Sequence, residues 1–406
     1  MASERFDVLI VGAGPAGSFA AERLAGAGRR VALFDGRPEG EPKACGGGVT
    51  SKALKAWPHL LEATGRMIEE LELYSPGGKR LHLKLEEPFA IYSRTAFDSY
   101  LRERAAAAGA RVIKERVTFQ QRKSEDEDWS VRARSGAEWS APVIVAADGA
   151  NSAIAKRLAG ALPPAEMEVA FGYYTPLPKS EKDAPTVVAF LPGWAGYAWA
   201  FPRVDHISFG IATTQEAFDH QALDAVLWTF MLGYYRMRED SSAGLWKSRE
   251  RDVELDARIE SELKSTAERY AARIPGLAPK TWDTRRAAGD GWALIGDAAG
   301  FADPVTGEGI YYALRSAEIF SEAYLAGRAS DYETRWREDF GQELRRASEM
   351  RRRFYGNFWG APFTERMIEF ARTHRGIRKT LGELIAGDQG YTDLKRKLAL
   401  RALRPL

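Results

Sequence analysis

The sequence is poor in the features that mark secreted, membrane-spanning or nucleic-acid-binding proteins. It holds one cysteine in 406 residues, which excludes an intramolecular disulfide and is typical of a reducing compartment. No apolar run reaches the length of about 18 residues that a membrane span needs. An apolar strand begins within the first few residues, so we expect no signal peptide. The net charge is only +2, and we expect no nucleic acid, no metal and a cytoplasmic location.

What the sequence does contain is a nucleotide-binding pattern at its start. An apolar run over residues 6–11 predicts a buried parallel strand, which leads directly into Gly12, Ala13, Gly14, Pro15, Ala16 and Gly17. A helix to about residue 27 and a second strand ending at Asp35 follow, in the order of a dinucleotide-binding unit. The glycines allow a sharp turn and close approach to a pyrophosphate, and the helix N-terminus attracts phosphate. Asp35 can accept a hydrogen bond from a ribose hydroxyl.

Three later segments have the same character. Arg94 precedes a helix expected over residues 96–108, where it either reaches a cofactor or is a solvated surface arginine. An apolar strand ends in Asp148-Gly149, which either binds a ligand at the strand's carboxyl end or only shapes a turn. Another strand ends in Gly296-Asp297, and a helix start follows at Gly307, Glu308, Gly309 and Ile310. Glycines at a helix start suggest backbone N–H groups that face a ligand oxygen.

The single cysteine lies in a glycine-rich loop. After Gly36 and Arg37, the chain reaches Cys45, which is followed by Gly46, Gly47 and Gly48. Consecutive glycines are costly to order and are expected where backbone lies against something flat or crowded. The alternative is that Cys45 is a small buried hydrophobic residue without a chemical role.

Residues 168–214 alternate short aromatic and β-branched runs with turns, which predicts an antiparallel sheet. With a period of two, Tyr197, Trp199 and Phe201 share one face of a strand. Ala198 and Ala200 share the other face and leave it open to close contact; ordinary sheet core is the alternative. We also expect a strand over residues 111–117 and helices over residues 218–237 and 252–272.

The end of the chain is basic and rich in leucine. Lys395, Arg396, Lys397, Arg401 and Arg404 lie among leucines in a segment that we expect to be helical. Such a helix can lie on an anionic membrane surface, and the alternative is a solvated helix face.

Together these elements resemble the FAD-dependent oxidoreductases of the p-hydroxybenzoate hydroxylase fold, and most closely the geranylgeranyl reductase family. That family has a proline-led cysteine-glycine segment, matched over residues 42–48, and a Thr-Gly-Glu-Gly-Ile helix start, matched over residues 306–310. Its Tyr-x-Trp-x-Phe-Pro-Lys strand is matched over residues 197–202, but Arg203 stands in place of the lysine. A later Gly-x-Gly becomes Gly210-Ile211-Ala212. The aromatic strand also resembles, less closely, the Trp-x-Trp-x-Ile-Pro of flavin halogenases.

The resemblance implies an α/β fold of the p-hydroxybenzoate hydroxylase or glutathione reductase type. A Rossmann-like FAD-binding domain would comprise residues 1–72, 94–160 and 285–330. An α+β substrate domain built on an antiparallel sheet would comprise residues 73–93 and 161–284, and a helical C-terminal region would follow over residues 331–406. FAD would contact each nucleotide-type element named above and also Val117. Its flavin ring would lie between the Cys45 loop and residues 307–310.

The implied activity is reduction of carbon–carbon double bonds in a prenyl lipid. Reduced FAD would deliver hydride from N5, Cys45 or a nearby group would supply the proton, and Tyr197, Trp199 and Phe201 would line the substrate cavity. NADPH and ferredoxin both remain open as the external reductant. Two alternatives stand beside this reading: an aromatic hydroxylase or halogenase on the same fold, and a non-catalytic lipid-binding flavoprotein.

Overall fold

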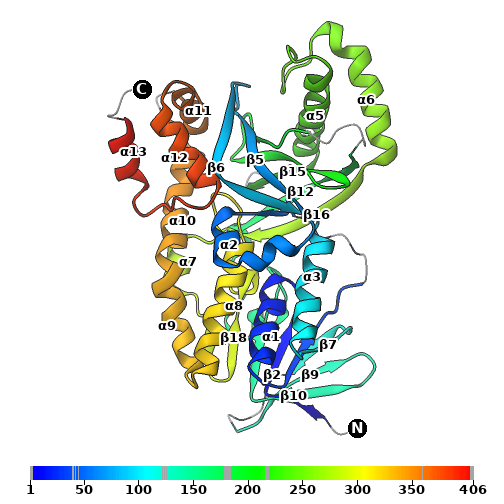
Figure 1. Cartoon of the computed structure of the whole chain (residues 1–406), viewed down its shortest axis with the longest axis vertical. Coiled ribbons are helices and arrows are strands. Elements are labelled where there is room, and N and C mark those ends of the chain that lie inside the picture. Colours follow the sequence, from blue (N-terminus) through cyan, green and yellow to red (C-terminus); the bar gives the residue numbers. More distant parts are fainter. Residues whose placement is uncertain are drawn as a thin grey trace. The chain divides into compact units, whose positions relative to one another are not determined.

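The computed structural model describes residues 3–38, 41, 43, 45–120, 122, 124, 126–177, 184–214, 219–358 and 360–402, with the side chain of residue 402 left out. These residues form two compact units. Unit 1 comprises Met1–Pro42, Arg94–Met167 and Ile274–Glu349, and unit 2 comprises Lys43–Ser93, Glu168–Arg273 and Met350–Leu406. The structure thus has the α/β fold class that the sequence predicted, with large sheets and a helical C-terminal region (Figure 1).

Unit 1 is built on a six-stranded sheet in the order β17-β18-β11-β2-β3-β7. Its strands are β2 (Val8–Val11), β3 (Val31–Phe34), β7 (Arg111–Ile113), β11 (Val143–Ala146), β17 (Ala288–Gly289) and β18 (Trp292–Leu294). All pairs are parallel except β17 with β18. Most residues of β2, β3 and β11 are buried, as expected for a parallel sheet covered on both faces.

Helices and a smaller sheet surround this parallel sheet. Helix α1 (Pro15–Gly26) packs against α3 (Arg94–Ala107) and α8 (Ile310–Leu325), as Figure 1 shows. A four-stranded sheet in the order β1-β10-β9-β8 contacts β2 through β10, and Trp139 meets the ring of Phe34 edge-on at 5.2 Å. It comprises β1 (Glu4–Arg5), β8 (Val117–Gln120), β9 (Trp129–Ala133) and β10 (Glu138–Ala141). The shorter helices are α4 (Ala153–Leu158), α7 (Pro279–Thr284) and α9 (Tyr332–Trp336).

Unit 2 is built on an eight-stranded sheet in the order β16-β12-β15-β14-β13-β5-β6-β4. Its strands are β4 (Gly48–Val49), β5 (Gly65–Tyr74), β6 (Arg80–Tyr92), β12 (Met167–Pro176), β13 (Val187–Phe190), β14 (Gly196–Pro202), β15 (His206–Thr214) and β16 (Glu268–Pro275). Strand β14 pairs antiparallel with both β13 and β15, so the predicted antiparallel sheet is present. Strand β13 pairs parallel with β5 on its other side.

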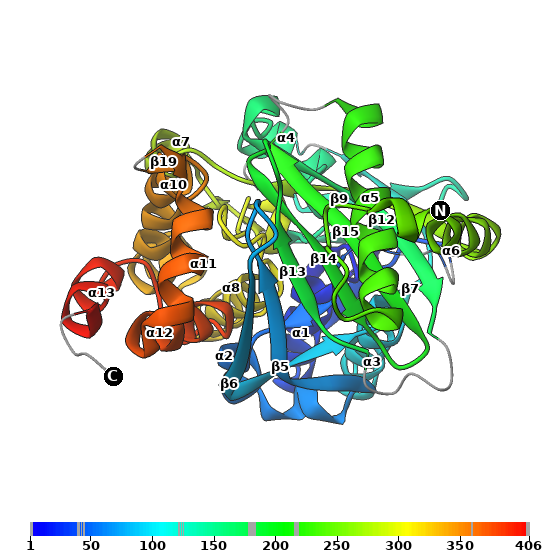
Figure 2. The ribbon, with the colours of Figure 1, turned by 90° about the horizontal axis from the view of Figure 1, so that it is seen from above.

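One face of this sheet carries the hydrophobic core of unit 2. Helix α5 (His220–Glu239) lies along β14 and β15 (Figure 2), and α6 (Val253–Thr266) packs on α5. Ala198 and Ala200 of β14 are fully buried in this core beside Phe230 and Tyr234 of α5. The alanine face of β14 is therefore ordinary sheet core under a helix, which was the alternative interpretation of this face.

Smaller helices complete unit 2. They are α2 (Ser51–Ala56), α11 (Phe363–Thr373), α12 (Arg375–Ile385) and α13 (Leu394–Ala402), while α10 (Gln342–Phe354) begins in unit 1. A short hairpin of β19 (Asn357–Phe358) and β20 (Ala361–Pro362) precedes α11. No helix among the described residues is long and apolar enough to cross a membrane.

Two secondary-structure predictions were wrong in detail. The strand expected over residues 111–117 is two strands, β7 and β8, that belong to different sheets. The helix expected over residues 252–272 ends at Thr266, and residues 268–275 form the edge strand β16 instead. Tyr270 explains the second difference, because its hydroxyl donates to the carbonyl of Phe209 at 2.7 Å and its ring covers Gly172 of β12. These tertiary contacts override the local helical pattern.

Candidate functional site

Unit 1 brings four predicted segments to one edge of its parallel sheet. Gly12 follows β2, Asp35 follows β3, Asp148 comes soon after β11, and Gly296 comes soon after β18. These four strands are neighbours in the sheet and run parallel, so their carboxyl ends meet at the same edge. Open α/β sheets bind their ligands at that edge. The structure therefore assembles a candidate nucleotide site from segments that are far apart in the sequence.

The glycines of the first segment are required by close backbone contacts. Gly12 has a φ of +107°, and a Cβ there would lie 2.3 Å from the carbonyl oxygen of Ala147. A Cβ on Gly17 would lie 1.9 Å from the carbonyl oxygen of Gly12. Gly14 differs, because its φ of −79° and ψ of −173° are open to any residue. Packing explains glycine at 12 and 17, whereas the backbone conformation does not require it at 14.

Two helices begin at this edge without a side-chain cap. Gly14 is the N-cap of α1 and Gly309 is the N-cap of α8, and neither glycine has a side chain that could cap its own helix. Gly296 lies where the two helices meet, since a Cβ there would be 3.1 Å from that of Ala16 and 3.3 Å from that of Ala313. Uncapped N–H groups and aligned peptide dipoles attract anions. The pair suits a ligand with phosphate or other electron-rich oxygens.

Asp148 has one carboxylate oxygen engaged and one available. Its Oδ2 accepts from the N–H of Ala153 at 3.1 Å at the start of α4. Its Oδ1 is buried and has no hydrogen-bond partner among the described residues. Burial raises the pKa of this carboxyl above its ordinary value, and hydrogen bonds from Ser152 and the backbone oppose that rise. A ligand hydroxyl that donates to Oδ1 would satisfy the buried oxygen.

The other acidic positions are already bound by side chains or turns. Asp35 accepts from Lys114 Nζ at 3.0 Å, and Arg102 Nε lies 3.4 Å from the same oxygen. Asp297 lies in a short 3-10 turn, with one carboxylate oxygen 3.0 Å from the position of a Cβ on Gly309. Asp303 holds the loop before α8 by accepting from the N–H groups of Val305 and Thr306. Gly307 in that loop has a φ of +71°.

The remaining predicted contacts of unit 1 are Arg94, Val117, Gly36 and Arg37. Arg94 is the first residue of α3, and Nε and Nη2 of its buried guanidinium each donate to Asp98 at 3.0 Å, so it is not a solvated surface arginine. Val117 opens β8 opposite Ala133. Arg37 lies 3.7 Å from Glu41, and Gly36 faces the backbone of Arg116.

In unit 2 the three predicted aromatic side chains form a ladder along one face of β14. The ring of Trp199 lies 5.8 Å from that of Tyr197 and 6.4 Å from that of Phe201. The Trp199 ring lies flat on β15, where a Cβ on Gly210 would be 2.1 Å from its Cζ2 atom. Its Nε1 donates to Ser208 Oγ at 3.4 Å. The ladder is therefore fixed by the strand beneath it.

The glycine-rich loop lies at the Phe201 end of this ladder. A Cβ on Gly46 would be 3.0 Å from the Phe201 ring and 3.5 Å from Trp199 Nε1. Cys45 is partly exposed and unpaired, and the N–H of Gly47 donates to its Sγ at 3.3 Å. The loop that carries the thiol thus lies against an aromatic, largely apolar surface. Pro42, which begins the matched segment, lies outside the described residues.

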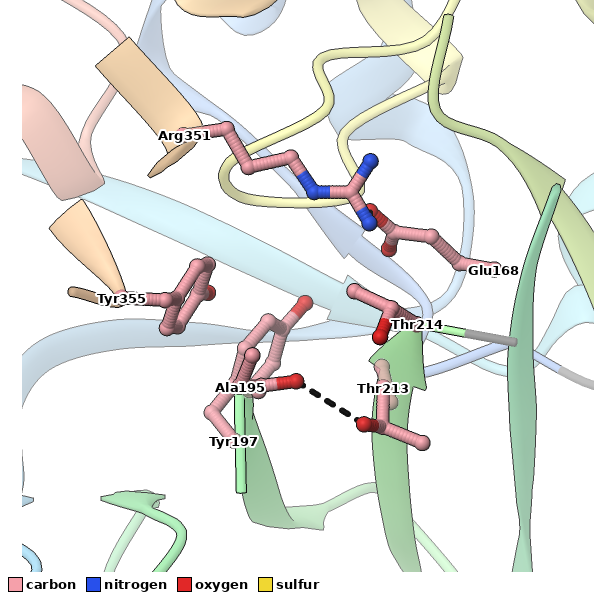
Figure 3. A pocket seen from close by; sticks show the side chains of 9 residues that line it. Glu168, Ala195, Tyr197, Thr213, Thr214, Arg351 and Tyr355 are labelled. Atoms are coloured by element: carbon pink, nitrogen blue, oxygen red, sulfur yellow. Dashed lines mark hydrogen bonds and ion pairs between the residues drawn. The ribbon is translucent and has the colours of Figure 1, made fainter. Parts of the chain in front are cut away.

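A small polar pocket lies at the Tyr197 end of the ladder (Figure 3). Arg351 and Glu168 form an ion pair across it at 2.9 Å, and Tyr197 and Tyr355 point toward each other below them. Thr213 donates to the carbonyl of Ala195 at 2.8 Å. Because the pocket is lined by hydroxyl groups and a neutralised ion pair, it would bind a neutral polar group of a ligand more favourably than an isolated charge.

Two groups of residues escaped the prediction. Lys114 and Arg102 bind Asp35, but they belong to no recognisable motif, so the sequence did not indicate these contacts. Arg203, Tyr174 and Tyr270 surround the glycine-rich loop and the ladder. Arg203 did carry a signal, because it departs from the family's strand motif.

Comparison with known proteins agrees with this architecture. Residues 5–191 match the model of an FAD binding domain. The chain is 30% identical over 346 residues to geranylgeranyl diphosphate reductase of Rhodobacter capsulatus, covering 79% of this chain and 75% of that one. It is 29% identical over 379 residues to digeranylgeranylglycerophospholipid reductase of Methanothrix thermoacetophila, covering 86% and 88%.

Solved structures agree on the fold. A geranylgeranyl bacteriochlorophyll reductase-like protein from Thermoplasma acidophilum superimposes with a TM-score of 0.73 at 21% identity, covering 98% of this chain and 100% of that one. A flavin-dependent brominase superimposes with a TM-score of 0.66 at 18% identity, covering 98% of each chain. The fold, the family match and the uncapped glycine-rich helix starts define an FAD-dependent oxidoreductase. Within that class, the chain belongs to the geranylgeranyl reductase family.

Replacing Gly14 tests the cofactor site without disturbing the fold. Gly14→Val places a branched side chain where a pyrophosphate approaches, in a backbone conformation that valine adopts. We expect FAD content to fall about tenfold or more while the far-UV circular dichroism spectrum stays unchanged. Gly26→Val, in the same helix with only ordinary contact at 3.9 Å, is the matched control. A Gly14→Val protein that retains full FAD would refute the assignment.

Replacing Gly210 tests the seating of the aromatic ladder. Gly210→Ala places a methyl group in the space of the Trp199 ring. We therefore expect the free energy of unfolding to fall by about 1–3 kcal/mol, as for other overpacked sites. Trp199→Phe shortens the ring, and the double variant should recover part of this loss in chemical denaturation. Strictly additive effects in the double variant would show that the two residues do not touch.

Proposed function

We propose that the protein reduces isolated carbon–carbon double bonds in the prenyl chain of a lipid or isoprenoid. The observation that carries the proposal is the juxtaposition of the aromatic ladder with the Cys45 loop in unit 2, within a chain of the geranylgeranyl reductase family. The relatives act, by name, on geranylgeranyl diphosphate and on digeranylgeranylglycerophospholipid. Both substrates carry long unsaturated apolar chains with a polar end.

The residues of unit 1 would hold FAD at the edge of the parallel sheet. The N–H groups at the start of α1 would face the pyrophosphate, and those at the start of α8 would face an oxygen of the flavin ring. Asp148 Oδ1 and Asp297 would accept from hydroxyl groups of the cofactor. Asp35, already held by Lys114, would accept from the ribose. When bound and reduced, the flavin supplies the hydride, and the protein contributes position and environment.

The residues of unit 2 would bind the substrate and complete the reduction. Tyr197, Trp199 and Phe201 offer an apolar surface to a prenyl chain. Saturating an alkene adds a hydride to one carbon and a proton to the other, and bound, reduced FAD would be the source of the hydride. The Cys45 thiol can donate that proton as a general acid. An external reductant, NADPH or ferredoxin, must then restore the reduced flavin.

Single-turnover reduction tests the proposal directly. Enzyme reduced with dithionite under anaerobic conditions should convert geranylgeranyl diphosphate to products heavier by two hydrogens per double bond, detected by mass spectrometry. Cys45→Ala and Cys45→Ser should both bind FAD and accept electrons, yet lose product formation by roughly 10²-fold or more if the thiol is the proton donor. Near wild-type turnover by Cys45→Ala would remove the thiol from the mechanism.

The two alternatives predict different outcomes in the same assay. An aromatic hydroxylase or halogenase would leave the prenyl chain unchanged without oxygen, and its reduced flavin would consume oxygen faster in the presence of an aromatic substrate. A non-catalytic lipid-binding flavoprotein would bind the prenyl lipid without forming product. The proposal therefore fails if no saturated product appears under anaerobic single-turnover conditions.

We also propose that α13 contacts anionic membranes peripherally. Lys395 and Arg396 are exposed on this helix, and Leu400 is 59% exposed. Arg401, by contrast, is bound by Glu383 and Thr380 of α12. Two exposed basic residues beside an exposed leucine support surface attachment. Arg404, the last predicted basic residue, lies outside the described residues.

Liposome binding tests this attachment. Surface attraction is on the order of 1 kcal/mol per basic residue, so Lys395→Ala/Arg396→Ala should weaken binding to phosphatidylserine vesicles roughly tenfold or more at low salt. High salt should release the wild type, because screening removes the attraction. Arg258→Ala, which removes an exposed arginine of α6, is the control. Equal binding by the double variant and the wild type would contradict the proposal and favour the interpretation of α13 as a solvated helix.

A further inference from the structure

We propose that Arg203 is a positioning residue that locks the Cys45 loop, residues 45–48, onto the aromatic face of the unit 2 sheet. Arg203 follows β14 and is buried, with 2% of its surface exposed. Its Nη2 donates to the carbonyl oxygen of Cys45 at 2.6 Å and to that of Gly46 at 3.3 Å. One guanidinium thus binds two consecutive carbonyl groups of the loop that carries the only thiol of the chain.

Arg203 and the loop stabilise each other: the guanidinium holds the loop carbonyls, and those carbonyls stabilise the buried positive charge. No carboxylate of the described residues forms an ion pair with Arg203, although it is buried. A buried charge without a counterion is costly unless its hydrogen bonds are satisfied. The two loop carbonyls and His206 Nε2, at 3.1 Å, accept from its two Nη atoms, and the ring of Tyr174 lies 5.1 Å away, whereas the buried Nε has no hydrogen-bond partner among the described residues. Displacing the loop would therefore leave the buried guanidinium without the two carbonyl groups that accept its hydrogen bonds.

The scaffold behind Arg203 is rigid. The N–H of Arg203 donates to the carbonyl of His206 at 2.7 Å and closes the turn between β14 and β15. Tyr174 of β12 stacks on Tyr270 with ring centroids 4.4 Å apart. The Tyr174 hydroxyl also donates to the carbonyl of Lys43 at 2.8 Å, so a second residue holds the chain just before Cys45. After the loop, β4 pairs with β6.

His206 makes the arrangement sensitive to protonation. Arg203 Nη1 can only donate, so His206 Nε2 must accept, and His206 Nδ1 then donates to Asp205 at 2.7 Å. The groups that face this imidazole are Arg203, Asp205, the ring of Tyr174 and, at longer range, Glu268 of β16. Burial, followed by Arg203, lowers the pKa of His206 below its ordinary value, and Asp205 opposes this. A lowered pKa means that the interaction is complete above about pH 6.5 and is lost as the pH falls through the folded-state value.

The single cysteine gives a direct readout of loop position. We would measure the second-order rate of Cys45 with 4,4′-dithiodipyridine in the FAD-loaded, full-length protein. Arg203→Met keeps much of the side-chain length but none of the donors, and it should raise this rate about tenfold or more as the loop opens. Arg203→Lys should lie between, since one ammonium can donate to the loop carbonyls but does not replace the second nitrogen that donates to His206. Arg251→Met removes an exposed arginine of the same unit and should leave the rate unchanged.

Turnover and pH supply two further readouts. Because the loop carries the proposed proton donor, Arg203→Met should lower kcat about tenfold or more with little change in KM. His206→Gln keeps an acceptor that does not titrate, so the ratio of wild-type to variant thiol rates should rise as the pH falls below about 6.5. A purely structural role would lower FAD content and melting temperature without exposing the thiol of the folded fraction.

The thiol measurement separates this inference from the function on which its catalytic part rests. If no prenyl substrate is reduced but Arg203→Met still exposes the thiol, the positioning role stands and the proposed reaction fails. If Arg203→Met does not fold, Tyr174→Phe, which removes only the hydrogen bond to Lys43, should raise the thiol rate by a smaller factor. Unchanged thiol rates in both folded variants would overturn the proposal.

Discussion

The close approach of neighbouring strands at their carboxyl ends is the constraint on which unit 1 depends. The carbonyl groups of Gly12 and Ala147 occupy the space that side chains on Gly17 and Gly12 would need. Removing those side chains lets α1 start directly above β2 and beside the end of β11. The helix N-terminus and the available oxygen of Asp148 then belong to one edge of the sheet. Glycine contributes no side-chain packing here, but its lack of a side chain allows backbone N–H groups to lie at this edge.

In unit 2, glycines likewise permit close approach to the backbone, in this case by aromatic rings. Gly210 lies under Trp199 and Gly172 under Tyr270, so each ring rests directly on the backbone of a neighbouring strand. Ser208 joins the two rings through hydrogen bonds to Trp199 Nε1 and to the Tyr270 hydroxyl. Because side chains alternate along a strand, the opposite face of β14 is free to pack its alanines against α5. One strand therefore supplies both the core of the unit and the wall of its candidate site.

The sequence was informative where function depends on local spacing and uninformative where it depends on distant contacts. The glycine fingerprint, Asp148-Gly149 and Gly296-Asp297 were found because each is a short pattern at the end of a strand. The edge strand β16 was missed because Tyr270 is fixed by Phe209, 61 residues earlier in the chain. Arg203 was noticed only as a departure from a motif, since its partner Cys45 lies 158 residues away. No local pattern can report such a contact.

Reductive and oxygen-dependent chemistry cannot be separated by the fold, because a brominase and a reductase-like protein both superimpose on this chain. The chemical requirements differ at one point. Saturating an isolated double bond needs a proton at carbon, whereas hydroxylating or halogenating an aromatic ring ends with loss of one. A reductase therefore needs an acid held beside an apolar substrate surface. On the proposed function, the Cys45 loop would meet that need while it stays against Phe201 and Trp199. On the proposed function, the residues that hold the loop there matter as much as the thiol itself.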